Sequence, residues 1–72
     1  MTYPKYSKGE QVTYTKHAWM FESRKEHYPE RPLGIVYRTS DTYDGWVEVA
    51  WPVVVQTIHK DNLIRYAFKD LG

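Results

Sequence analysis

Short stretches in which apolar and polar residues alternate predict a chain built mainly of β-strands. The clearest stretch is residues 46–51, WVEVAW. Its Val47, Val49 and Trp51 fall on one face, which we expect to lie in the core. The same alternation turns Trp46 to the opposite face, so we expect its indole ring to point outward.

Four more strands are expected from alternation and from runs of β-branched and aromatic residues. Val12 and Tyr14 share one face of the first strand, and Tyr66 and Phe68 share one face of the last. Together with Trp51, the aromatic members of these faces are expected to fill the core. The four strands are residues 11–15, 33–39, 53–58 and 64–68.

The segments between these strands carry turn residues. Residues 40–45, SDTYDG, bond readily to their own backbone or accept positive φ, which is typical of a turn. Residues 59–63 predict a short turn of the 3-10 type. Pro52 has no N–H, so it marks a strand end, a bend or an edge. Residues 1–8 are polar, and we expect a loosely ordered arm there, before a domain of residues 9–72.

Residues 16–32 form the longest connection. Their first half favours about two helical turns, and the prolines that follow would end such a helix. We expect a long, partly ordered loop with a short helical turn, of which some aromatic side chains pack onto the sheet or onto a partner. The loop carries four large apolar side chains: Trp19, Met20, Phe21 and Tyr28.

The order of these elements predicts the fold class. Short strands, a long first loop and a one-turn link before the last strand are the element order of an SH3-like barrel. We therefore predict an all-β fold, a small five-stranded antiparallel SH3-like barrel with a long first loop. Closing the sheet would remove the strand edges that invite aggregation.

Four short motifs carry a family resemblance: Gly9-Glu10-Gln11-Val12, Gly34-Ile35-Val36, Val47-Glu48-Val49-Ala50-Trp51 and Asp61-Asn62-Leu63. With them, residues 9–68 resemble the SH3-like and KOW-like small β-barrels, including short barrel proteins encoded by bacteriophages. The resemblance implies that the first glycine turns into strand one and that the second permits a close backbone approach. It implies that the leucine plugs one end of the barrel. It also implies a phage-encoded accessory or host-directed factor.

Length and composition narrow the class further. The chain has 72 residues, enough for one small domain, and no cysteine, so its stability must come from packing. An aromatic content of 17% supplies the large side chains for this. No apolar run approaches the roughly 20 residues that span a bilayer, and residues 1–8 lack the apolar core of a signal peptide. We expect a cytoplasmic protein without membrane contact, in the host cytoplasm if a phage encodes it.

Neither a catalytic site nor a metal site is expected. Asp41, Asp44 and Glu48 lie near one hairpin, but the two aspartates are better explained as turn residues. The chain has no glycine-rich phosphate loop and no nucleophile elbow. We predict that the protein is not an enzyme and holds no cofactor. The three histidines have no metal-ligand spacing on one element and no cysteine beside them: His17, His27 and His59.

The aromatic residues outside the expected core point to binding. SH3 domains hold proline-rich peptides on aromatic side chains of their first loop and its neighbours. A similar surface here would use Trp19, Tyr28, Tyr43 and Trp46. The competing interpretation is that the loop folds back and buries Trp19 and Phe21 as a lid. Because Trp is enriched at binding hot spots, we favour a non-enzymatic protein-interaction module with a protein partner.

The alternative function is a small nucleic-acid-binding barrel of the KOW type. Glu22, Glu26 and Glu30 lie among the basic residues of the loop, which is typical of a solvated segment with many salt bridges. The net charge of only +1 also favours a protein partner over nucleic acid. Nucleic-acid contacts would come from five basic residues interleaved with aromatic ones: Lys16, Arg24, Lys25, Arg31 and Arg38.

Overall fold

The chain folds into one antiparallel sheet of five strands, in the order β4-β3-β2-β1-β5. The computed structural model describes residues 6–21, 24–39 and 45–71. The predicted β-rich fold with five antiparallel strands is confirmed. The strands are β1 (Gln11–Tyr14), β2 (Gly34–Thr39), β3 (Trp46–Ala50), β4 (Val55–His59) and β5 (Leu63–Arg65).

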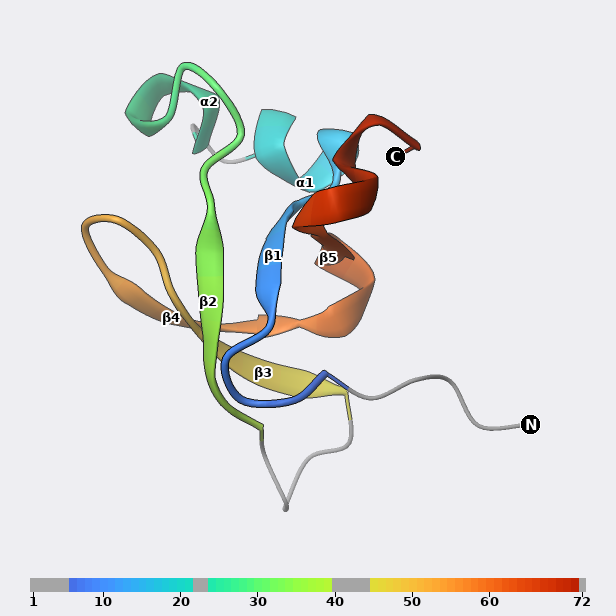
Figure 1. The fold of residues 1–72 in the computed structure, drawn as a ribbon. Helices are drawn as coiled ribbons and strands as arrows, with labels where there is room; N and C mark the ends of the chain where they lie inside the picture. Colours follow the sequence, from blue (N-terminus) through green and yellow to red (C-terminus); the bar gives the residue numbers. More distant parts are fainter. Residues whose placement is uncertain (1–5, 22–23, 40–44, 72) are drawn as a thin grey trace.

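Short helices cover one end and one side of this sheet. In Figure 1, α1 and α2 lie at the end of the sheet above β1 and β2, and η2 lies beside β1 and β5. The residue 16–32 connection therefore holds two short helices, where we expected one helical turn. The helices are α1 (Lys16–Met20), α2 (Arg24–His27), and the 3-10 helices η1 (Lys60–Asn62) and η2 (Tyr66–Leu71).

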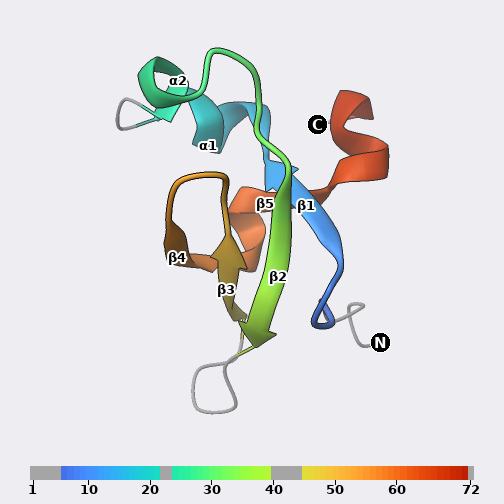
Figure 2. The ribbon, with the colours of Figure 1, turned by 60° about the vertical axis from the view of Figure 1, so that its left-hand side comes forward.

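The sheet is strongly curved but open. In Figure 1 the β3–β4 hairpin crosses behind β2, and in Figure 2 it lies beside β2 on the side away from β1. The pairing of β2 with β3 shifts register between Val36 and Arg38. Such a bulge bends a strand and increases its twist. Within the described residues, β4 pairs with β3 alone and β5 with β1 alone, so the expected closure of the sheet into a barrel is not observed.

The core lies on the concave side of the sheet. Burial of Val12, Val47, Val49 and Trp51 was predicted from the alternation and is confirmed, since each is at most 5% exposed. Trp46, on the other face of β3, is 41% exposed as predicted. The buried apolar residues are Val12, Tyr14, Ala18, Val36, Val47, Val49, Trp51, Ile58 and Leu63.

Gly34 is a glycine because large side chains fill the space above it. A Cβ atom at this position would lie 2.6 Å from the Trp51 ring and 2.6 Å from the Val49 side chain. The close approach expected here is therefore made with two core side chains. The missing Cβ at Gly34 lets the indole ring of Trp51 approach the β2 backbone closely.

The fourth strand begins two residues later than predicted. The Trp51 N–H donates a hydrogen bond of 2.8 Å to the Val54 carbonyl, so Pro52 and Val53 form a turn. Val53 and Val54 are 79% and 53% exposed. The run of three valines predicts a strand by propensity alone, but a proline and the hairpin geometry move its start to Val55.

The last strand is shorter than predicted. It pairs with β1 over three residues, from Leu63 to Arg65, and the chain then turns into η2. Tyr66 is half-buried and Phe68 is 53% exposed, so the prediction that both fill the core is wrong. A segment with alternating apolar residues forms a strand only as far as a neighbouring strand is present to hydrogen-bond with it, and here β1 provides partners only up to Arg65.

Local contacts explain the other boundaries. The Thr15 side chain accepts a hydrogen bond of 3.2 Å from the Ala18 N–H and caps α1. The 3-10 turn predicted over residues 59–63 is present as η1. Tyr6 packs against the core, although it belongs to the predicted arm, of which residues 1–5 lie outside the described residues. Over the described ranges, no helix is long and apolar enough to cross a membrane.

Two tryptophans of one hairpin test this assignment of faces. We expect Trp51→Ala to lower the free energy of unfolding by about 3–5 kcal/mol, the usual cost of truncating a buried large aromatic residue. Trp46→Ala serves as the matched control and is expected to cost about 1 kcal/mol or less, because its ring is already partly in water. Urea unfolding followed by circular dichroism measures both. Equal losses would contradict the assignment of faces.

Candidate functional site

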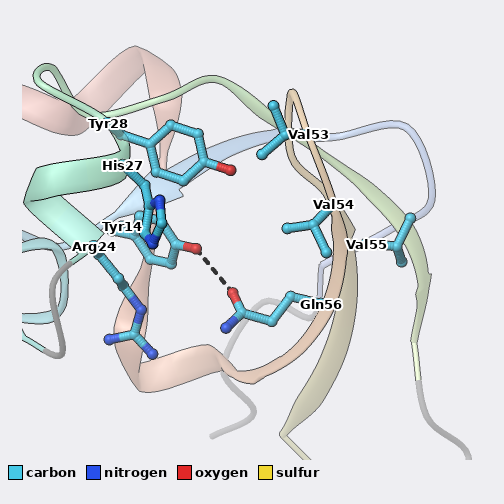
Figure 3. Close-up of a pocket in the computed structure, with 8 residues that line it drawn as sticks. All are labelled: Tyr14, Arg24, His27, Tyr28, Val53, Val54, Val55 and Gln56. Atoms are coloured by element: carbon cyan, nitrogen blue, oxygen red, sulfur yellow. Dashed lines mark hydrogen bonds between the residues drawn. The ribbon is translucent and has the colours of Figure 1, made fainter.

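A groove of about 440 Å³ opens between the α1–α2 segment and the start of β4. Figure 3 shows the side chains of Tyr14 and Tyr28 facing those of Val53, Val54 and Gln56 across it, while the Val55 side chain points away. One wall comes from the end of β1 and from α2 with the residue that follows it: Tyr14, Arg24, His27 and Tyr28. The other wall comes from the β3–β4 connection and β4: Val53, Val54, Val55 and Gln56.

Beneath the groove, its lining residues Tyr14 and Gln56 form a cluster with the buried Trp51. The Tyr14 and Trp51 rings stack with centroids 4.1 Å apart and an interplanar angle of 20°. The Gln56 Oε1 atom accepts a hydrogen bond of 2.8 Å from the Tyr14 hydroxyl and one of 3.1 Å from Trp51 Nε1. One amide oxygen therefore satisfies two aromatic donors and fixes the distance between β1 and β4.

Tyr28 forms the aromatic part of the first wall. Its backbone carbonyl accepts a hydrogen bond of 2.8 Å from Trp19 Nε1, and its N–H donates to the Arg24 carbonyl at 2.9 Å. Its hydroxyl points toward Val53 and Val54 (Figure 3). This oxygen is buried and has no hydrogen-bond partner in the described part of the chain. Leaving a buried hydroxyl unpaired costs about 1–3 kcal/mol.

The valine wall is apolar and open to solvent. Val53, Val54 and Val55 are 79%, 53% and 53% exposed. The Trp51–Val54 hydrogen bond described above holds the turn that presents them. Exposed apolar side chains that adjoin in this way, beside aromatic ones, mark a binding surface more often than isolated exposed residues do.

Arg24 places a positive charge at the same groove. Its Nη1 donates a hydrogen bond of 2.9 Å to the Ala18 carbonyl, and its guanidinium carbon lies 5.1 Å from the centroid of the Tyr14 ring. A cation over the face of an aromatic ring is attracted by the ring quadrupole. The guanidinium is therefore held in place by α1 and by the Tyr14 ring. His27, on the same wall, is exposed.

Burial controls the ionisation of the Tyr14 phenol. It raises the pKa of Tyr14 to about 12, while the positive charge of Arg24 opposes part of the rise. The phenol is therefore neutral at physiological pH and donates its proton to Gln56. Burial also raises the pKa of Tyr6, which lies under the Arg65 guanidinium at 4.9 Å.

Of the four aromatic residues predicted to bind, the three that the structure describes do not lie on one surface. Trp19 and Tyr28 lie together and both pack partly on the core, and Tyr28 lines the groove. Trp46 is the first residue of β3, which begins at the end of the sheet opposite the helices (Figures 1 and 2). Its ring meets His59 edge-on at 5.3 Å. Tyr43 lies outside the described residues.

The alternative lid interpretation describes only part of the loop. Trp19 is half-buried, but Phe21 is 55% exposed and Met20 is 65% exposed. The indole of Trp19 therefore anchors the segment, while its neighbours stay in solvent.

Most of the basic residues considered for nucleic-acid binding make contacts within the chain. Arg38 pairs with Glu48 on the outer face of the sheet, and this hydrogen bond raises the pKa of Arg38. Arg31 donates from Nη1 to the Tyr14 carbonyl at 3.2 Å and from Nη2 to the Lys69 carbonyl at 2.6 Å. Lys25 lies 5.5 Å over the Trp19 ring. These contacts, with those of Arg24, leave Lys16 as an exposed cation on α1.

The histidines considered as metal ligands lie in different parts of the structure. His17 stacks near Phe21, His27 lines the groove and His59 lies beside Trp46. In the described ranges, no three His, Cys, Asp or Glu side chains are grouped so that they could hold a metal ion. Asp41 and Asp44 fall outside those ranges.

The sequence predicted Tyr28 as a protein-binding residue and Arg24 as a nucleic-acid contact, but it did not indicate the other groove residues. Tyr14 was assigned to the core, and it belongs both to the core and to the groove lining. The signal for the second wall was present in the valines that follow Pro52. Successive side chains of a strand point to opposite faces, so three consecutive valines put apolar side chains on both faces.

Comparison of the chain with protein-family models, with curated proteins and with solved structures found no match.

The raised pKa of Tyr14 makes the stability depend on pH in the alkaline range. The folded state holds this phenol proton more tightly than the unfolded chain, in which the pKa is about 10. The resulting stability is complete below pH 10 and is lost as the pH rises through about 12. We expect the difference in unfolding free energy between the wild type and Tyr14→Phe to shrink over this range, as measured by urea unfolding. A difference that stays constant up to pH 12 would contradict the shift.

A second experiment compares the contributions of Arg31, which makes hydrogen bonds within the chain, and of the exposed Lys16 to stability. Arg31→Met should lower the free energy of unfolding by about 2 kcal/mol, because two hydrogen bonds from a charged group are lost. Lys16→Met removes the same charge from the same segment and should change stability by no more than about 0.5 kcal/mol. Thermal and urea unfolding measure both. If both variants are as stable as the wild type, the Arg31 contacts are not structural.

Proposed function

We propose that this protein is a non-enzymatic interaction module that binds an extended segment of a partner protein in the groove between Tyr28 and the β3–β4 connection. The observation that carries the proposal is the pair of exposed valines, Val53 and Val54, facing an aromatic wall. A groove of about 440 Å³ is within the usual size of ligand sites, roughly 300–1,000 Å³.

The position of β4 supports an extended ligand. In the described structure β4 is an edge strand that pairs with β3 alone, and it starts at the groove. Its residues, VQTIH, include no lysine, proline or acidic residue of the kind that commonly protects an exposed edge. An extended segment can add to such an edge through backbone hydrogen bonds while its side chains enter the neighbouring groove.

The finer fold assignment belongs to the same proposal. The strand order β4-β3-β2-β1-β5, with a 3-10 turn before the last strand, supports an SH3-like arrangement whose seam between β4 and β5 stays open. In this arrangement the long first loop and the β3–β4 connection flank one end of the sheet, where the groove lies. The internal contacts of Arg24, Arg31 and Arg38 favour a protein partner over nucleic acid.

A random peptide library displayed on yeast tests the proposal. We expect peptides selected by the wild type to bind the double variant Val53→Ser, Val54→Ser about tenfold more weakly, because the apolar wall is lost. Phe68→Ser is the matched control, since Phe68 is also 53% exposed but belongs to η2. Fluorescence anisotropy measures the affinities. Selected peptides that bind the double variant as well as the wild type would overturn the proposal.

A further inference from the structure

We infer that the partner segment carries an acidic side chain next to an apolar one, with its carboxylate bound by Arg24, His27 and Tyr28. This inference rests on the proposed function and specifies the chemistry of its ligand. It follows from three features of the groove: the charge of its lining, an unpaired buried donor and the adjoining valines.

Among the described residues, the lining of the groove carries positive charge and no negative charge. Arg24 is its permanent cation, and His27 adds a second basic side chain beside it. None of the eight lining residues is an aspartate or a glutamate. Among the described residues, the ion pairs lie elsewhere, at Arg38–Glu48, His59–Asp61 and Arg65–Glu10. The electrostatic complement of this groove is therefore an anion.

The guanidinium of Arg24 is held in position before a ligand arrives. It is fixed by the Ala18 carbonyl at 2.9 Å and by the Tyr14 ring at 5.1 Å. A positioned guanidinium loses less side-chain entropy on binding than a free one, and its planar fork matches a carboxylate. Lys16 is an exposed cation of the same segment and lies outside the groove lining.

The Tyr28 hydroxyl supplies a hydrogen-bond donor on the same wall. Its oxygen is buried without a partner in the described structure, and it points across the groove toward Val53 and Val54. The oxygen is fully covered in the unbound structure, so the Tyr28 ring turns toward the groove when it donates to a carboxylate, and this hydrogen bond removes the cost of the unpaired group. Because a purely apolar ligand would leave the Tyr28 hydroxyl unpaired, a ligand with a hydrogen-bond acceptor is preferred.

The opposite wall determines which type of residue lies next to the acidic residue in the partner segment. Val53 and Val54 offer apolar surface within the same groove, so a Leu, Ile or Val next to the acidic residue would bury them. We commit to an internal acidic side chain of a partner protein. A C-terminal carboxylate is usually captured by a nest of backbone N–H groups, whereas this groove presents side chains.

The test uses two end-blocked peptides that differ in one group, Ac-Gly-Ala-Leu-Glu-Val-Ala-Gly-NH2 and the same peptide with Gln in place of Glu. Each is titrated into the ¹⁵N-labelled full chain and followed by amide chemical shifts. We expect the Glu peptide to shift the amides of residues 24–28 and 53–56 and to bind about fivefold more tightly than the Gln peptide. The preference should weaken with added salt.

Three variants identify which protein side chains cause the preference for the Glu peptide. Arg24→Gln should abolish the preference for Glu, while Lys16→Gln, which removes one positive charge outside the groove, should keep it. His27→Gln changes an exposed side chain, leaves the fold intact and is expected to reduce the preference, so it serves if Arg24→Gln unfolds the chain. A preference that both groove variants retain would overturn the inference.

The remaining outcomes separate the inference from the function it rests on. If both peptides shift the groove amides equally, the inferred preference for an acidic side chain is wrong, while the proposed peptide-binding function is supported. If neither peptide, nor any peptide selected from the library, shifts those amides, the proposed function fails. Tighter binding of a Glu-free peptide with a free C-terminus, or of an oligouridine, would overturn the inference in favour of a terminal carboxylate or of phosphates.

Discussion

The stack of Tyr14 on Trp51, tied by Gln56, joins the two halves of the sheet. Because β4 and β5 do not pair in the described structure, backbone hydrogen bonds alone do not hold the β3–β4 hairpin against β1. The stacked rings and the two hydrogen bonds to Gln56 Oε1 make this connection with side chains. The absence of a Cβ at Gly34 lets the indole lie where the stack requires it.

The candidate site is built on the same three residues. One side of the Tyr14 ring faces Trp51, while the Arg24 guanidinium lies over the ring at the groove. Core packing thus positions the cation that we propose for ligand recognition. A substitution at Tyr14 would therefore affect stability and binding together, whereas Val53, Val54 and His27 are exposed and lie outside this stack.

The first wall of the groove depends on a few polar contacts in a segment with little regular structure. Arg31 ties it to β1 and to η2, and Trp19 bonds to the Tyr28 carbonyl. Each of these contacts ends on a backbone oxygen, so it positions the chain as well as a side chain. Arg24, Lys25 and Arg31, which the sequence offered as nucleic-acid contacts, make these or similar contacts within the chain.

The sequence by itself determined the strands, the inward face of β3 and the outward position of Trp46, because period-two alternation is a local property of a half-buried strand. It did not determine where β5 ends, since that depends on how far β1 runs beside it. Nor did it place Arg24 and Val54 on facing walls, because 30 residues separate them along the chain. Only the curvature of the sheet and the side-chain stack across its open seam bring these residues together.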